Sequence, residues 1–289
     1  MSRFELITPR TLSEAIALLG DGDPEVRPYS GGTAMMLMMK TGVFQPRVLV
    51  NLRGLDAAYG RIEAMPDGRL RIGALATLSA LEHSAVASKH APIFPRMLKR
   101  LANVRVRNVA RVGGALAHGD PHMDLPPVLA CLGGEALLSG PEGERRVPVE
   151  GLYTGYYETV LHADEVITAV EVPDQAGLTT VYLKMTTRSA DDWPALGLAV
   201  ALRCAEGVIQ DCRLVVSAAT ETLRRLPGAE RELIGRIADD AIFRRAGDAA
   251  AEETETMSDA LGSAEYKTQL LRVQLRRALQ QALVENRQP

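Results

Sequence analysis

The first part of the chain alternates short apolar runs with polar segments in a pattern that predicts a small α/β lobe. A capping pattern before the apolar residues 15–19 predicts a helix that ends at Gly20. Residues 34–40 are rich in helix formers, and residues 47–52 form a short apolar run typical of a buried strand. We therefore expect a first lobe over residues 1–55.

The middle of the chain mixes strands and helices without regular βαβ alternation. We expect strands at residues 69–74, 136–138 and 166–172, and helices at residues 78–86, 93–101 and 125–131. This mixture is typical of an α+β fold rather than of a doubly wound parallel sheet. It predicts a second lobe over residues 56–176.

Three strand-like runs and then helices predict a C-terminal domain over residues 177–289. The strand-like runs are residues 180–187, 196–204 and 212–217. Residues 264–285 carry apolar side chains at loosely helical spacing, and the arginines of this stretch fall outside that stripe: Arg272, Arg276 and Arg277. A basic stripe of this kind is typical of a solvated helix face.

The composition and the net charge limit which binding partners and which cellular compartment we expect. The 289 residues are 46% hydrophobic and 24% charged, with a formal net charge of −3, which gives no reason to expect nucleic acid. No apolar run approaches the roughly 18 residues that a membrane span needs, and the N-terminus does not resemble a signal peptide. The three cysteines form no Cys-x-x-Cys, which favours free thiols in a reducing cytoplasm and excludes a four-cysteine iron–sulfur cluster.

Two glycine pairs are the strongest candidates for binding chemistry. Gly31-Gly32 precedes Thr33, and Gly113-Gly114 follows Val112. A glycine pair permits positive φ and close approach of a ligand to the main chain, and successive exposed N–H groups form a concave anion site. Two such loops, each beside an expected helix, indicate a ligand with more than one phosphate that is held by backbone donors rather than by a Lys/Arg clamp.

Each glycine pair alone is a weak motif, and a plain turn remains an alternative for the first. Neither is part of Gly-x-Gly-x-x-Gly, and the chain has no Gly-Lys-[Ser/Thr] of a P-loop. The second pair runs on into a segment with His118, Asp120, His122 and Asp124. We do not expect a metal there, because Pro121 between the histidines disrupts helical His-x-x-x-His geometry. Asp124 is either a ligand contact or a simple helix N-cap.

Taken together, these segments resemble a known family, the FAD-binding medium subunits of molybdenum hydroxylases. The matching residues occur in the family's order: Gly-Gly-Thr with a downstream Lys40, the stretch Arg111-Val-Gly-Gly-Ala-Leu-Ala-His-Gly-Asp-Pro-x-x-Asp-Leu-Pro-Pro, the segment Asp164-Glu-Val-Ile-Thr, and Tyr182-Leu-Lys-x-x-x-Arg188. The resemblance covers nearly the whole chain. It implies a two-lobed FAD-binding cradle of the vanillyl-alcohol-oxidase (PCMH) type, followed by a C-terminal α/β domain.

The resemblance also implies a set of FAD-contacting residues, and no catalytic or metal-binding residue. They are Pro28, Tyr29, Ser30, Gly31, Gly32, Thr33, Ala34, Met35, Leu101, Arg111, Val112, Gly113, Gly114, Ala115, Asp124, Ile167 and Lys184. Ala115 stands where many relatives have Asn or Asp, so one polar contact is expected to be missing. Lys184 is expected near the flavin or its ribityl chain, with an exposed strand lysine as the alternative. FAD should be non-covalent, because no histidine lies near the first glycine pair.

The same resemblance implies that the chain works in a complex. A large subunit with a molybdenum–pterin centre and a small subunit with [2Fe-2S] clusters are the expected partners, in a dimer of heterotrimers. The chain would pass electrons from the small subunit through FAD to an external acceptor. Two alternatives remain open: a self-contained flavin oxidoreductase with Tyr153, Tyr156 and Tyr157 lining a substrate pocket, and a non-catalytic nucleotide-binding protein.

Overall fold

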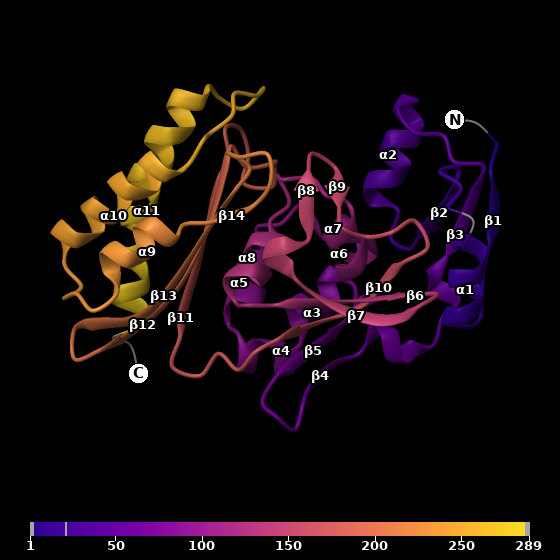
Figure 1. Ribbon diagram of the computed structural model, residues 1–289, viewed down its shortest axis with the longest axis horizontal. Helices are drawn as coiled ribbons and strands as arrows, with labels where there is room; N and C mark the ends of the chain where they lie inside the picture. The colour runs from indigo at the N-terminus through magenta and orange to yellow at the C-terminus, as the bar shows by residue number, and fades with distance from the viewer. Residues whose placement is uncertain (1–2, 21, 287–289) are drawn as a thin grey trace.

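Three sheets follow one another along the long axis of the molecule (Figure 1). The computed structural model describes residues 3–20 and 22–286. The first sheet is parallel and has the order β1-β3-β2, with these bounds: β1 Glu5–Ile7, β2 Val26–Tyr29 and β3 Val48–Asn51. Helices α1 (Leu12–Leu19) and α2 (Thr33–Thr41) belong to this lobe, and two short 3₁₀ turns, Leu52–Gly54 and Ala57–Gly60, follow β3.

The central sheet is antiparallel and has the order β4-β5-β10-β6-β7. Its strands are β4 Ile62–Ala64, β5 Leu70–Gly73, β6 Glu135–Gly140, β7 Gly143–Pro148 and β10 Val166–Val172. The helices of this lobe are α3 Leu78–His83, α4 Ala85–His90, α5 Ile93–Leu98, α6 Val104–Val109, α7 Val112–Ala117 and α8 Leu125–Cys131. A 3₁₀ turn (Val149–Gly151) leads into a small separate pair, β8 (Tyr153–Gly155) with β9 (Glu158–Thr159).

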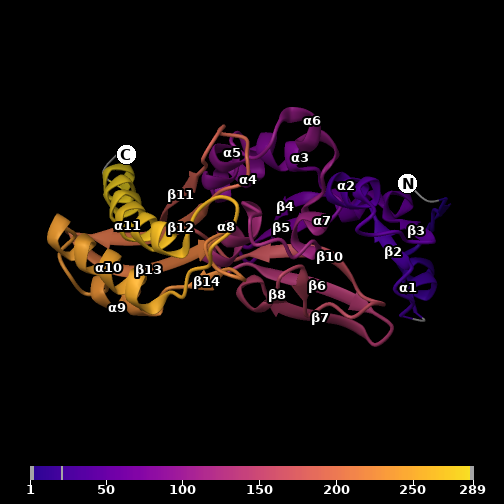
Figure 2. The same ribbon diagram turned by 90° about the horizontal axis from the view of Figure 1, so that it is seen from above.

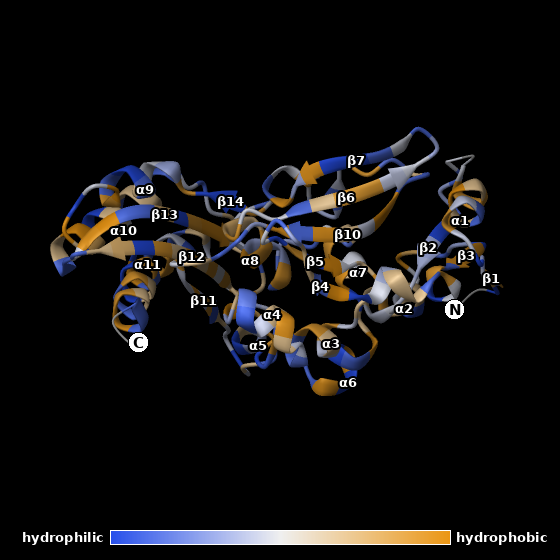
Figure 3. Cartoon of the chain, turned by 90° about the horizontal axis from the view of Figure 1, so that it is seen from below, coloured by the Kyte–Doolittle hydropathy of each residue, from blue (hydrophilic) through white to orange (hydrophobic). Residues whose placement is uncertain are grey.

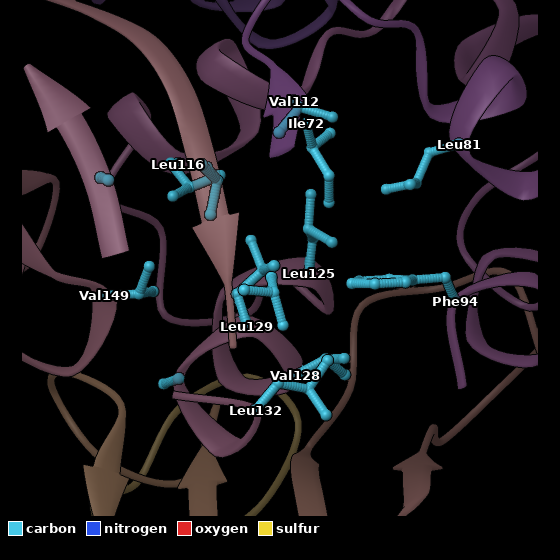
Figure 4. Close-up of a cluster of buried hydrophobic side chains, with 14 of the residues drawn as sticks. Ile72, Leu81, Phe94, Val112, Leu116, Leu125, Val128, Leu129, Leu132 and Val149 are labelled. Atoms are coloured by element: carbon cyan, nitrogen blue, oxygen red, sulfur yellow. The ribbon is translucent and has the colours of Figure 1, made fainter. Parts of the chain in front are cut away.

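The core of the central lobe forms around α8, which is buried along its whole length. Leu125, Val128 and Leu129 from this helix lie among Phe94 of α5 and Leu116 of α7 (Figure 4). This all-apolar helix is flanked by Asp124 at its start, so burial of the helix brings a carboxylate into the interior.

The C-terminal domain is an antiparallel sheet with helices packed on one face (Figures 1 and 2). Its strands are β11 Thr179–Met185, β12 Leu196–Ala205, β13 Val208–Ser217 and β14 Arg224–Arg225, in that order. Its helices are α9 Pro227–Leu233, α10 Asp240–Glu253 and α11 Ala264–Asn286. Apolar residues of α10 and α11 pack on the sheet, and polar positions face outward (Figure 3).

The α+β class is confirmed, and several expected elements match closely. The helix expected at residues 125–131 and the strand expected at residues 166–172 have those bounds. The basic face of α11 is mostly ion-paired, since Arg272 contacts Asp248 and Arg276 contacts Asp240. The boundaries proposed at residues 55/56 and 176/177 remain predictions.

Candidate functional site

The first glycine pair turns the chain from β2 into α2. Gly32 is the N-cap of α2 and has φ 69°, so the expected positive φ is present at this glycine. A Cβ at Gly32 would lie 2.4 Å from the ring of Tyr29, which leaves no room for a side chain. Gly31, by contrast, does not have a positive φ. It lacks a side chain because the backbone of Val109 and Ala110 packs directly against it.

Backbone donors of this segment are left without protein acceptors. The first helical bond of α2 runs from Met36 N–H to the Gly32 carbonyl at 2.9 Å. The N–H groups of residues 30–32, 34 and 35 have no acceptor among the described residues. Such a run of donors at the start of a helix matches the needs of a phosphate group.

The second glycine pair lies in a helix, not in the expected loop. Gly113 and Gly114 occupy the first turn of α7, and neither has positive φ, so that part of the prediction was wrong. Gly113 N–H donates to the Ala74 carbonyl at 2.8 Å, and a Cβ there would lie 2.7 Å from the Ala74 Cβ. Gly113 is therefore required for packing of α7 on the segment after β5. The Gly114 N–H has no acceptor in the part of the chain that the structure describes.

The two glycine segments face each other. A Cβ at Gly31 would lie 2.5 Å from the Val109 carbonyl oxygen, and one at Gly114 would lie 3.6 Å from Ser30 Oγ. The turn before α2 therefore lies against the segment between α6 and α7 and against the first turn of α7; α2 and α7 are both labelled in Figures 1 and 2. The two glycine pairs were expected to serve one ligand, and their backbones are adjacent.

A second group of expected site residues meets at the junction with the C-terminal domain. Lys184 Nζ lies 2.9 Å from Asp124 Oδ2, and Tyr182 Oη donates to Asp124 Oδ1 at 2.7 Å. Lys184 is 5% exposed, so the alternative of an exposed strand lysine was wrong. Asp124 occupies the N-cap position of α8 but makes no capping hydrogen bond, so the simple N-cap alternative was also wrong.

Burial and the neighbouring positive charge shift the pKa of Asp124 in opposite directions. Burial raises the pKa of Asp124, while the Lys184 ammonium and the Tyr182 hydroxyl oppose that rise. Burial and the Asp124 charge raise the pKa of Tyr182 well above its usual range, so its hydroxyl stays a donor. Tyr182 was not among the expected site residues, although its i, i+2 spacing from Lys184 on a strand places both on one face.

The remaining expected residues lie around these two centres. The carbonyl of Arg100, the residue before Leu101, accepts from Lys184 Nζ at 3.2 Å. Ile167 lies on β10 and is 8% exposed. The carbonyl of the next residue, Thr168, accepts from the N–H of Ala74, and Ala74 is the residue on which Gly113 of α7 packs. Ala115 is half-buried against the central core.

A cavity of about 140 Å³ opens beside Lys184 and Tyr182. Its other lining residues come from α5, the segment after it, β11 and α11: Ile93, Arg96, Met97, Arg100, Val181, Gln281 and Glu285. Arg96 pairs with Glu285 across it. The cavity thus lies between the second lobe and the C-terminal domain.

His122 and Asp120, which were considered above as part of a metal site, lie in a charged cluster whose other members, Asp259 and Lys267, the sequence did not indicate. His122 Nδ1 is 2.9 Å from Asp120 Oδ1 and its Nε2 is 3.1 Å from Asp259 Oδ2. Asp259 also pairs with Lys267, which is fully buried in α11. Trp193 stacks on the His122 ring with a centroid separation of 5.9 Å. Over residues 3–20 and 22–286, no group of three or more His, Cys, Asp or Glu is arranged to hold a metal.

The residues present fit a dinucleotide such as FAD. Unsatisfied N–H groups from two facing segments offer donors for a pyrophosphate, and Cβ atoms at Gly31 or Gly32 would collide with the cradle itself. The expected contacts thus fall in two places: a run of backbone donors without protein acceptors at the first lobe, and a buried polar group around Asp124.

Comparison with known proteins agrees with this geometry. The family described as the FAD binding domain in molybdopterin dehydrogenase matches residues 2–175, and the CO dehydrogenase flavoprotein C-terminal domain matches residues 181–282. The chain belongs to the FAD-binding medium subunits of molybdenum hydroxylases. As a member of that family it is an oxidoreductase subunit, and its cofactor is FAD.

Individual medium subunits match over almost their full length. The carbon monoxide dehydrogenase medium chain of Hydrogenophaga pseudoflava is 30% identical over 97% of both chains. The nicotine 6-hydroxylase medium subunit of Paenarthrobacter nicotinovorans is 31% identical over 95% of both. A solved structure of carbon monoxide dehydrogenase from Hydrogenophaga pseudoflava superposes with a TM-score of 0.94 at 31% identity, covering 98% of each chain. Among the described residues, no helix is both long and apolar enough to cross a membrane.

Proposed function

We propose that this chain is the electron-transfer flavin subunit of a three-subunit molybdenum hydroxylase. It receives electrons from a small subunit that carries [2Fe-2S] clusters and passes them to an external acceptor. A large subunit with a molybdenum–pterin centre oxidises the substrate, and the complex is a dimer of heterotrimers. The full-length similarity to medium subunits of carbon monoxide dehydrogenase and of nicotine 6-hydroxylase supports this assignment.

The observation that carries the proposal is the convergence of the two glycine segments. Ser30 and Gly114 are neighbours in space, and unsatisfied N–H groups on both segments provide donors for one pyrophosphate. When bound, FAD supplies the redox chemistry, accepting and releasing electrons one or two at a time. The expected FAD residues of these two segments, Pro28 to Met35 and Arg111 to Ala115, bind and orient the phosphates, without a covalent link.

The buried polar group around Asp124 positions the other end of the cofactor. Tyr182 and Lys184 hold the Asp124 carboxylate, and the Arg100 carbonyl, next to Leu101, also accepts from Lys184. Because the Lys184 ammonium is paired with Asp124, its role in this proposal is to hold that carboxylate in position for the cofactor. The proposed cytoplasmic location agrees with the free thiols of Cys131, Cys204 and Cys212.

The test is purification of the chain alone and together with its partner chains, followed by visible spectroscopy. We expect dissociable FAD on the chain, and bleaching of the flavin band by the enzyme's substrate only when both partner chains are present. Bleaching and turnover by the lone chain would instead identify a self-contained flavin oxidoreductase. Absence of FAD from every preparation, even after incubation with excess FAD, would refute both functions.

A further inference from the structure

The cavity of about 140 Å³ between the second lobe and the C-terminal domain has more positive charge in its wall than the protein neutralises. Three cations line it: Arg96, Arg100 and Lys184. Arg96 pairs with Glu285, and Lys184 pairs with Asp124. Among the described residues, the Arg100 guanidinium forms neither an ion pair nor a hydrogen bond, and only its backbone carbonyl is engaged, by Lys184. One positive charge at the cavity is therefore left without a counter-charge, which matches a ligand with a single negative charge.

Lys184 has a hydrogen-bond donor left for such a ligand. An ammonium carries three N–H donors. Two of them are used, by Asp124 Oδ2 at 2.9 Å and by the Arg100 carbonyl at 3.2 Å. The third has no acceptor in the described structure, and the Lys184 side chain, which is only 3% exposed, lines the cavity. A buried ammonium N–H beside open space favours an acceptor in that space.

Much of the remaining wall of the cavity is apolar. Ile93 and Met97 line it from α5 and Val181 lines it from β11, and each of the three is at most 3% exposed. Ligand pockets typically combine such apolar walls with a few polar groups that fix the orientation of the ligand. An inorganic anion gains nothing from an apolar wall. An organic acid, in contrast, can place its charge at the cations and bury its hydrocarbon part.

We propose that this cavity binds a small organic carboxylate. Arg100 and Lys184 hold the carboxylate group, and the hydrocarbon part lies against Ile93, Met97 and Val181. Hydrogen bonds from a guanidinium or an ammonium to a carboxylate are stronger than those between neutral groups. Of the expected FAD-contacting residues, only Lys184 lines the cavity, so binding there does not depend on the cofactor.

A carboxylate in this position bridges two parts of the chain. Arg100 follows α5 in the central lobe, and Lys184 belongs to β11 of the C-terminal domain. A ligand that bonds to both stabilises the folded chain, because it binds the native state and not the unfolded one. It also shares with Asp124 the ammonium that holds that carboxylate, so occupation of the cavity is coupled to the buried ion pair.

Calorimetric titration and thermal unfolding of the full chain without FAD test this site. The probe is butyrate, and its control is butyramide, a neutral analogue of similar size, at constant ionic strength. We expect butyrate to bind saturably and to raise the melting temperature, and butyramide to do neither. Arg100→Gln should weaken butyrate binding by about tenfold, the value of one charge-assisted hydrogen bond. Lys99→Gln removes the same charge from the neighbouring exposed residue, which does not line the cavity, and should bind butyrate like the wild type.

Two results of this titration would overturn the proposal. The first is the lack of saturable butyrate binding, or equal binding by Arg100→Gln and the wild type. Because Arg100 is exposed, its substitution leaves the packing of the core intact, so this comparison stays valid. The second is tighter binding of inorganic phosphate than of butyrate, which would make the cavity a site for inorganic anions.

Repeating the titration in the presence of FAD shows whether the cavity is separate from the cofactor site. An unchanged butyrate dissociation constant supports the proposal, whereas competition between butyrate and FAD would assign the cavity to the cofactor and contradict it. If the chain binds no FAD, the proposed function fails, and the titration without FAD still decides whether the carboxylate site exists.

Discussion

The ammonium of Lys184 lies 2.9 Å from the carboxylate of Asp124, and both side chains are almost fully shielded from water. Asp124 precedes α8 in the central lobe, and Lys184 belongs to β11 of the C-terminal domain. The pair therefore joins two parts of the chain through a buried ionic contact, and Tyr182 donates a second hydrogen bond to the same carboxylate.

Removing Lys184 should be strongly destabilising, because it leaves Asp124 buried without its counter-charge. We expect Lys184→Met to lower the free energy of unfolding by about 3–5 kcal/mol, measured by denaturant titration. Lys89→Met, at an exposed lysine of α4, is the control and should change it by less than about 0.5 kcal/mol.

The double variant Asp124→Leu/Lys184→Met checks the cause of that loss. Replacing both partners removes the unpaired charge, so stability should recover relative to Lys184→Met. If Lys184→Met were as stable as the wild type, the contact would not be the buried ion pair that the distances indicate.

The two glycine pairs should respond differently to a methyl group. A Cβ at Gly31 would lie 2.5 Å from a backbone oxygen and 2.9 Å from the Cα of Ala110, and neither can rotate away. We expect Gly31→Ala to cost about 1–3 kcal/mol of stability through overpacking. Gly114→Ala meets only Ser30 Oγ at 3.6 Å, an ordinary contact, and adds a better helix former within α7.

Thermal unfolding of the two apoproteins measures this contrast. The melting temperature should fall for Gly31→Ala and stay level or rise slightly for Gly114→Ala. Equal melting temperatures would mean that the two glycine segments do not meet as tightly as the backbone contacts indicate.

Local patterns predicted the elements well, and long-range pairings account for what they missed. The apolar run at 125–131 and the β-branched run at 166–172 determine their own structure, and both were predicted. Gly113-Gly114 looked like a loop because glycine is a poor helix former. Tertiary contact outweighed that propensity, since Gly113 donates to Ala74 and packs on it.

In the candidate site, too, residues within local motifs were predicted, and contacts between distant segments were not. The glycine pairs, Asp124 and Lys184 were found because each belongs to a recognisable local motif. The contact of Lys184 with Asp124 spans 60 residues, and the contact of His122 with Asp259 spans 137, so neither follows from local spacing.

Stability should fall with rising pH through the titration of His122. Burial alone would lower the pKa of this imidazole, but hydrogen bonds to Asp120 and Asp259 raise it above its usual value. A raised folded-state pKa means that the stabilisation is complete below the ordinary value of about 6.5 and is lost as pH rises through the folded value.

The measurement compares the free energy of unfolding of the wild type and His122→Gln over the pH range 5.5 to 9. The difference between the two should be largest at the acid end and shrink as pH rises. Asp120 and Asp259 have lowered pKa values and titrate well below this range, so they should not contribute to the trend. A difference that grows with pH would show that the neutral imidazole is the stabilised form.

Trp193 should report the charge of His122 directly. It is the only tryptophan in the chain, and its indole stacks on the His122 ring at 5.9 Å with an interplanar angle of 20°. A protonated imidazole quenches indole fluorescence more strongly than a neutral one, and the contact itself is partly a cation–π interaction that weakens on deprotonation.

Emission of the apoprotein should therefore rise with pH, with a midpoint above about 6.5, and His122→Gln should remove the step. His162→Gln, at an exposed histidine, should leave it in place. A step that survives His122→Gln would assign the titration to another group and contradict the stacked arrangement.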